Sequence, residues 1–198
     1  MKREKGIPSN TDDIVLIPSI REFEGEDGVM RKSFNLDISI NGELFTGYID
    51  HFSLLTPYRH LTPDWEYRLS DFYPFNCSCG IGGCAGIYDG IYFKDRKHSI
   101  EWRVPERSGY GFLNKRFFSF FRPMYEYQLL KVYDFILSNP DILDGTDDTC
   151  TLGDWVDWVE GSGEAVEIRS HLSDLRNRIE SNKRLQIWLN TQNAPRYF

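Results

Sequence analysis

Phe34-Asn-Leu-Asp-Ile-Ser-Ile40 is followed directly by Asn41-Gly42 and then by Leu44-Phe-Thr-Gly-Tyr-Ile49. Apolar and polar residues alternate along the first segment, which is the period of a strand with one buried face. Asn-Gly favours the two positive φ angles that a two-residue hairpin turn requires. The stretch therefore predicts an antiparallel hairpin whose turn is formed by Asn41 and Gly42.

One further strand is predicted upstream of this hairpin. Ile14-Val-Leu-Ile17 is a short apolar run, typical of a buried strand, and we expect it to end at Pro18. The acidic, glycine-containing stretch Glu22–Gly28 then predicts a turn.

The downstream half of the strand-rich region predicts a second hairpin. Ile87–Phe93 and Ser99–Val104 are its two strands, with a turn at Lys94–His98 and a stop at Pro105. The aromatic-rich residues 108–121 predict one more strand.

Helical patterns begin where the strand patterns end. Apolar residues recur at three- and four-residue steps over Pro123–Leu137, and Asn139-Pro140 marks a stop. Glu164–Leu189 predicts two more helices, separated near Ser181-Asn182. Because strands dominate the first half and helices the second, we predict an α+β fold, with antiparallel hairpins packed against the later helices.

The length of 198 residues suits one compact domain with a sizeable core. Residues 1–13 are polar and predict a mobile tail. Residues 14–198 are expected to form a single domain, strand-rich over 14–121 and helix-rich over 122–198.

The charge balance bears on the choice of partner. The chain has 30 Asp and Glu against 23 Lys and Arg, a formal net charge of -7. A field of this sign repels nucleic acid, so we expect no nucleic-acid partner and favour a basic protein. The short basic clusters Lys94–Lys97 and Asn114–Arg116 are flanked by acids and are typical of solvated turns.

The cellular location follows from the apolar segments. Met1-Lys-Arg-Glu-Lys-Gly6 is basic, but no apolar run follows it, so no signal peptide is predicted. No window approaches the ~18 apolar residues that span a bilayer. We therefore expect a cytoplasmic protein without a membrane partner, in which the four cysteines stay reduced.

The motif best suited to metal binding or thiol chemistry is a cysteine cluster. Cys77, Cys79 and Cys84 lie within eight residues and are interleaved with glycines. Reduced structural thiols are the favoured interpretation, because structural zinc sites use two separate ligand pairs. A zinc site and a thiol-redox role remain alternatives. A fourth zinc ligand would come from Cys150, His98, His51 or His60.

The cluster also carries a resemblance. Cys77-Ser-Cys79-Gly80…Gly83-Cys84, followed by a strand with Glu101-Trp102 and a helix near Tyr125, resembles a group of uncharacterised bacterial proteins with a CxCGxxGC core. The resemblance covers about residues 34–137. It implies a bacterial or phage origin and, since the group has no established activity, it implies no catalytic residue.

A second candidate site is an acidic aromatic segment beside the acidic loop Asp141–Asp148. Its two tryptophans are three residues apart, so on a helix they share one face. Such a face belongs to the core or, if exposed, to a surface that binds a basic protein. The candidate contact residues are Asp154, Trp155, Asp157, Trp158 and Glu160.

No catalytic residue is predicted. The sequence contains neither a Gly-x-Ser-x-Gly elbow nor a Gly-Lys-Ser/Thr phosphate loop. We therefore expect a cytosolic bacterial or phage interaction protein of the inhibitor or immunity type, which neutralises a toxin or defence enzyme through its acidic aromatic surface, and no cofactor. The alternatives are a small zinc-binding or thiol protein, and an enzyme whose site is assembled from distant residues.

Overall fold

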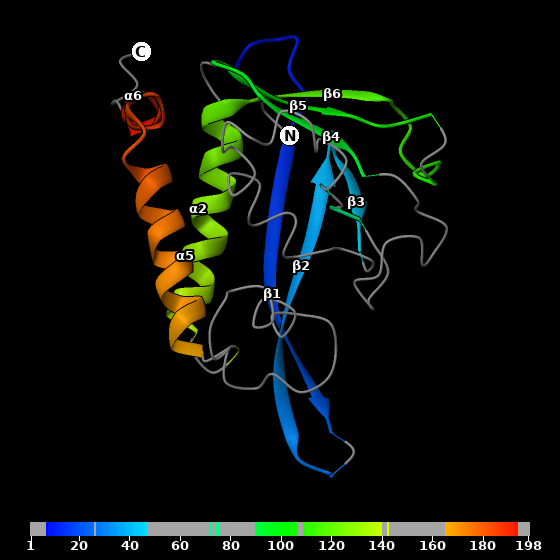
Figure 1. The fold of residues 1–198 in the computed structure, drawn as a ribbon, viewed down its shortest axis with the longest axis vertical. Coiled ribbons are helices and arrows are strands. Elements are labelled where there is room, and N and C mark those ends of the chain that lie inside the picture. The colour runs from blue at the N-terminus through cyan, green and yellow to red at the C-terminus, as the bar shows by residue number, and fades with distance from the viewer. Residues whose placement is uncertain are drawn as a thin grey trace.

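The computed structural model describes residues 7–25, 27–46, 72, 74, 75, 90–106, 109–139, 142 and 165–193. They form two three-stranded antiparallel sheets and three helices, and the N-terminal strands pack against the C-terminal helices (Figure 1). The predicted α+β class is therefore confirmed. Within these residues the last strand ends at Phe121 and the first helix begins at Arg122.

The first sheet consists of β1 (Ile14–Glu24), β2 (Met30–Ile40) and β3 (Glu43–Phe45), in that order. The predicted hairpin is confirmed, because Ile40 pairs with Glu43 across a two-residue turn. Asn41 and Gly42 have φ angles of 53° and 84°, as this turn requires. The alternating apolar side chains of β2 are buried, so the sequence period sets which face of the sheet meets the core.

The prediction that the first strand ends at Pro18 is wrong, because β1 continues to Glu24. β1 is an edge strand, and the backbone N–H of Leu16 donates outward to the side chain of Gln128 on a helix (3.3 Å). Pro18 lies two residues later and has the same orientation. Its missing N–H therefore removes no bond to β2, which is why the edge tolerates it.

The second sheet consists of β4 (Tyr92–Asp95), β5 (Ser99–Arg103) and β6 (Phe117–Phe121). The predicted β4–β5 hairpin is confirmed by the pairing of Tyr92 with Arg103. Its turn is shorter than the predicted Lys94–His98, because Lys94 and Asp95 still pair with Glu101 and Ile100 and belong to β4. The last strand is shorter than the predicted span of 108–121. Gly109 has a φ of 76° and Leu113 donates to the carbonyl of Tyr110, so a turn occupies the beginning of that span.

Aromatic side chains fill the core beneath the second sheet. The ring of Trp102 has edge contacts with Phe72, Phe120 and Tyr125 at centroid distances of 5.1, 5.0 and 6.1 Å. Because Tyr125 belongs to a helix and Phe120 to β6, these contacts fix that helix against the sheet.

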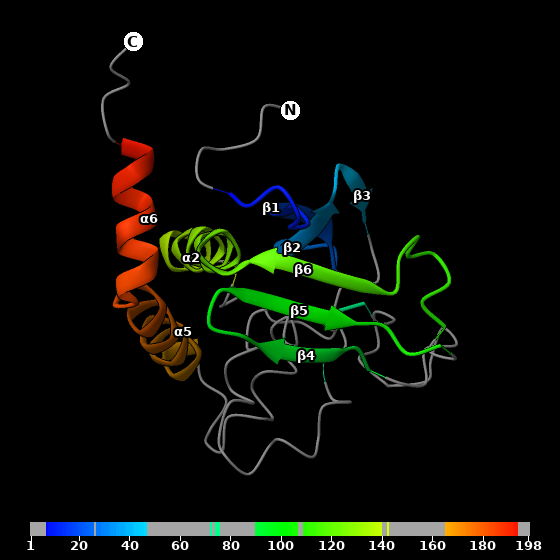
Figure 2. The same cartoon turned by 90° about the horizontal axis from the view of Figure 1, so that it is seen from above.

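The three helices are α2 (Arg122–Ser138), α5 (Ala165–Glu180) and α6 (Lys183–Asn193). Helix α2 follows β6 without a loop and lies between the first sheet and α5–α6 (Figures 1 and 2). The predicted helix over Pro123–Leu137 and the break at Ser181-Asn182 are both confirmed. No helix in the described part of the chain is long and apolar enough to cross a membrane.

Asp12 joins the two sheets, although it belongs to the segment expected to be a tail. Its carboxylate accepts hydrogen bonds from the Ser119 backbone N–H (2.8 Å), the Asn41 side chain (2.9 Å) and Lys115. Burial alone would raise the pKa of Asp12, but these donors hold it below its ordinary value. The end of β2 and the middle of β6 are therefore held together by one charged side chain.

Candidate interaction surface

The β4–β5–β6 sheet has one buried and one solvent-facing surface. Side chains such as Phe93, Trp102 and Phe118 face the core. Since neighbours along a strand point to opposite faces, the alternate residues form the outer face of the sheet. Figure 2 looks down on this sheet, and no described helix lies in front of its strands. Phe121, at the end of β6, lies on this side too, but its ring packs against Trp188 of α6 at a centroid distance of 6.3 Å. We call the rest of this surface the outer face; it is formed by Tyr92, Lys94, Glu101, Arg103, Phe117 and Ser119.

One row across the outer face combines two rings and a guanidinium group. Arg103 pairs directly with Tyr92 on one side and with Phe117 on the other. Tyr92 and Phe117 are 41% and 44% exposed, and Arg103 is exposed as well. Adjacent strands lie about 4.8 Å apart, so the backbone places one aromatic residue on each side of Arg103.

The next row of the outer face is charged. Lys94 lies opposite Glu101, and Glu101 forms an ion pair with Arg96 at 3.2 Å. Among the described residues, no carboxylate forms an ion pair with Lys94, Lys97 or Arg103. The outer face and its turn therefore carry an excess of positive charge, although the whole chain is acidic.

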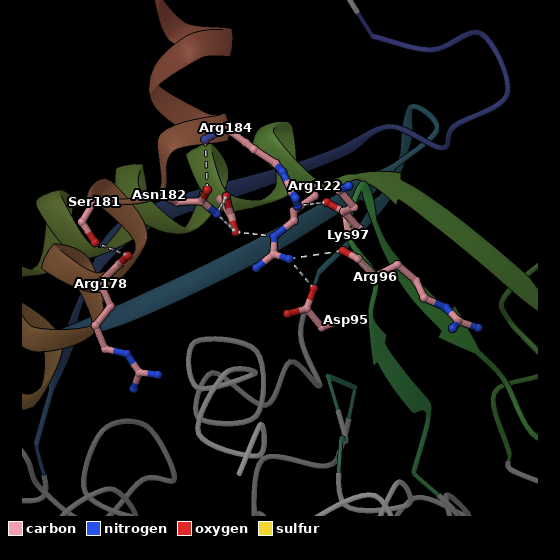
Figure 3. Close-up of polar contacts among 9 residues, drawn as sticks. Asp95, Arg96, Lys97, Arg122, Arg178, Ser181, Asn182 and Arg184 are labelled. Carbon is pink, nitrogen blue, oxygen red and sulfur yellow. Dashed lines mark hydrogen bonds and ion pairs between the residues drawn. The ribbon is translucent and has the colours of Figure 1, made fainter. Parts of the chain in front are cut away.

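A buried charged junction holds the β4–β5 turn against the helices (Figure 3). Arg122 lies at its centre, where its guanidinium donates to Glu126 (2.7 Å) and forms an ion pair with Asp95 (2.8 Å). The side-chain amide of Asn182, from the α5–α6 corner, donates to both carboxylate oxygens of Glu126 at 2.9 Å. Arg184 completes the junction by donating to the carbonyl of Lys97.

The electrostatics of this junction are those of paired but desolvated charges. Glu126 is only 2% exposed, and burial raises its pKa although Arg122 and Asn182 oppose the shift. Burial also raises the pKa of Asp95, against the attraction of Arg122 and Arg184. These carboxylates are occupied by protein groups, so the junction is a structural clamp that sets where the turn lies.

The sequence of the α5–α6 corner explains why the helices break there. The side chain of Asn182 accepts a hydrogen bond from the N–H of Arg184 (3.1 Å) and caps the start of α6. Ser181 donates to the carbonyl of Arg178 (2.9 Å) at the end of α5. The corner thereby places Arg184 at the β4–β5 turn, where it bonds the carbonyl of Lys97 (Figure 3).

Most of the residues that the sequence analysis selected lie outside the described residues. His98, a candidate zinc ligand, lies exposed in the β4–β5 turn, where its carbonyl accepts the N–H of Arg122 (3.2 Å). In the described part of the chain, no group of three or more His, Cys, Asp or Glu side chains is arranged to hold a metal ion. The candidates outside the described residues are Cys77, Cys79, Cys84, Cys150, His51, His60, Asp154, Trp155, Asp157, Trp158 and Glu160.

Both basic clusters lie in exposed segments, as expected, but they also make long-range contacts. Arg96 contributes its carbonyl to Arg122, Asn114 bonds Glu43 of the first sheet, and Lys115 bonds Asp12, which precedes that sheet. The row of Tyr92, Arg103 and Phe117 was not among the sites predicted from the sequence. The alternation of buried and exposed residues within the predicted second hairpin could have placed Tyr92 and Arg103 on one face. Phe117 joins the row only through the pairing of β5 with β6.

No protein-family model, curated protein or solved structure matches the chain.

Proposed function

We propose that this protein is a cytoplasmic interaction protein of the inhibitor or immunity type, from a bacterium or phage, which neutralises a toxin or defence enzyme by binding it. The observation that supports this proposal is the exposed row of Tyr92, Arg103 and Phe117 on the outer face. Tyrosine and arginine are enriched among the residues that contribute most to protein–protein binding, because they bury large areas and retain polar contacts.

The rigidity of the site also favours binding of a protein partner. The row lies on paired strands, and the charged junction at Arg122 holds the β4–β5 turn. A preorganised surface loses little conformational entropy on association, so more of its contact energy appears as affinity.

The net charge indicates how such a partner would be attracted. With a formal charge of -7, the protein attracts a partner of net positive charge over the Debye length of about 8–10 Å. We propose that the acidic aromatic residues Asp154, Trp155, Asp157, Trp158 and Glu160 contribute to this attraction. Basic partners include many enzymes that act on nucleic acids, which fits an inhibitor.

Affinity capture tests the proposal. The full chain is immobilised, a captured protein is purified from the native host, and its association rate is measured across a salt series. We expect association to slow as salt increases, and to slow further when Asp154 and Asp157 are both replaced by Lys. Failure to capture any protein, or association independent of salt and of these substitutions, would contradict the proposal.

The alternative function, a zinc-binding or thiol protein centred on Cys77, Cys79 and Cys84, has its own test. Metal analysis of the purified protein would favour it if zinc is present at one equivalent and is lost from a Cys79→Ser variant.

A further inference from the structure

We infer that the outer face of the β4–β5–β6 sheet binds an acidic patch of the partner protein, even though the partner as a whole is basic. The inference rests on the proposed function and names the chemistry of the partner surface that meets this sheet. It comes from the local charge of the face, which has the opposite sign to the net charge of the chain.

The cations of this face come from one hairpin. Lys94 and Arg103 come from the paired strands, and Lys97 comes from the turn between them. All three are exposed, and no carboxylate among the described residues forms an ion pair with any of them. The opposing charge on the outer face is Glu101, which is already paired with Arg96 at 3.2 Å.

This distribution restricts which part of a basic partner can dock here. A basic patch placed on Lys94 and Arg103 would be repelled, because like charges brought together at an interface oppose association. A patch with two or three carboxylates would instead pair with these cations while its apolar atoms cover Tyr92 and Phe117. The acidic net charge of the chain then attracts the basic partner, and the cations of the outer face determine which side of that partner docks here.

The same features favour a protein over nucleic acid as the occupant. A nucleic-acid strand presents a phosphate at every nucleotide, whereas this face offers few unpaired cations and contains Glu101. The net charge of -7 also repels a polyanion beyond the face itself. A small acidic patch meets neither difficulty, because its few carboxylates match the few available cations.

The size of the face indicates its place within an interface. The face has three strands of up to five residues, spaced about 4.8 Å apart and rising about 3.3 Å per residue. Its area is therefore far smaller than the ~800 Å² that each partner buries in a standard complex. The row of Tyr92, Arg103 and Phe117 therefore suits the centre of an interface. An exposed cation of the turn such as Lys97 suits its rim.

Site-specific photo-crosslinking tests this inference in the native host. Tyr92 is replaced by p-benzoylphenylalanine in the full chain, and the crosslinked peptides are identified by mass spectrometry. Val29 is the control position, because its side chain is 53% exposed and the β1–β2 turn lies at the opposite end of the molecule from the β4–β5–β6 sheet (Figure 1). Two charge variants carry the Tyr92 probe, one with Lys94→Glu and Arg103→Glu, the other with Lys94→Gln and Arg103→Gln. Thermal unfolding checks that each variant is folded.

We expect the Tyr92 probe to crosslink to one protein, at a peptide that contains at least two Asp or Glu. The yield should fall at least tenfold in the charge-reversed variant and by an intermediate factor in the neutral variant, while the Val29 probe gives no adduct. A peptide without acidic residues, an adduct with nucleic acid, or a yield unaffected by charge would overturn the inference.

The outcomes separate this inference from the proposed function. If a partner is captured but the Tyr92 probe does not crosslink to it, the inference fails and the proposed function stands. If no protein is captured and neither probe gives an adduct, both fail.

Discussion

The β1–β2–β3 sheet and the β4–β5–β6 sheet are both three-stranded antiparallel sheets with strands in sequence order, yet different interactions hold them in place. The first sheet depends on an Asn-Gly turn and on apolar alternation, and Gln128 of α2 bonds its outer edge at Leu16. The second sheet is fixed at one end by the charged junction of Arg122, Glu126 and Asn182, and its outer face meets solvent.

The difference indicates a division of roles between the two sheets. Strands that are neighbours in sequence build both sheets, and the first sheet acts as the scaffold on which α2 packs. The second sheet is positioned by charged side chains, and its charged residues fall into two classes. Charges in the junction are buried and paired with one another, so they set the position of the turn, whereas the cations of the outer face are exposed and available to a partner.

The largest expected effect is at the junction. Arg122→Ala should lower the free energy of unfolding by about 3 kcal/mol, because it leaves the buried carboxylates of Glu126 and Asp95 without their cation. Arg176→Ala is the matched control. Arg176 also pairs with two carboxylates, Asp134 and Glu180, but both are about half exposed, so a loss of at most about 1 kcal/mol is expected. Urea unfolding measures both, and equal losses would contradict the assignment of the junction as a buried clamp.

The turn of the first sheet should show the next largest effect. Gly42→Val should cost about 1–2 kcal/mol, because a β-branched residue is forced to a φ of 84°. An added Cβ at Gly42 has no atom within 4 Å, so the cost comes from the backbone alone. Gly111→Val is the control, because its Cβ would also meet open space but its φ is not positive. An unchanged melting temperature for Gly42→Val would contradict the prediction.

The junction should also show a pH dependence with a defined sign. The raised pKa of Glu126 means that the folded protein binds its proton more tightly than the unfolded chain, for which the ordinary value is 4.5. Its contribution to stability is therefore fully present below pH 4.5 and is lost as pH rises through the folded pKa. Glu126→Gln should remove this loss, so its stability relative to the parent should increase with pH above 4.5.

Asp12 provides the opposite case for the same measurement. Its pKa is lowered from 3.8, so its contribution is present above pH 3.8 and is lost as pH falls through the folded pKa. Asp12→Asn should therefore lose most stability, relative to the parent, at neutral pH. Urea titrations from pH 3 to 7 compare the variants, and the same sign for both carboxylates would contradict the account.

The smallest effect on stability is expected on the outer face. Replacing Lys94 and Arg103 by Gln should change the free energy of unfolding by no more than about 0.5 kcal/mol, because both side chains are exposed and outside the described ion pairs. A loss of more than about 1 kcal/mol would show that the outer face is structural, and the contrast with the junction would disappear.

Particular residues show how far the sequence predicted the fold and the site. The positions of the Asn41-Gly42 hairpin, the β4–β5 hairpin, α2 and the α5–α6 break were all predicted, because each depends on a local pattern or a local cap. The continuation of β1 through Pro18 was not predicted, because it depends on which edge of the strand pairs with β2. The basic cluster at Lys94–Lys97 appeared in the sequence as an ordinary turn, since its proximity to Arg122 and Arg184 depends on packing.

The sequence by itself therefore determined the α+β class, the positions of its helices and hairpins, and the acidic net charge. Periodicity, turn residues and composition carry this information, and none of them depends on distant neighbours. The tertiary structure alone decided which charges are buried at the Arg122 junction and which remain exposed beside Tyr92 and Phe117. Burial and pairing depend on segments far apart in the chain, because the same Arg or Glu costs or contributes free energy according to the groups that folding places around it.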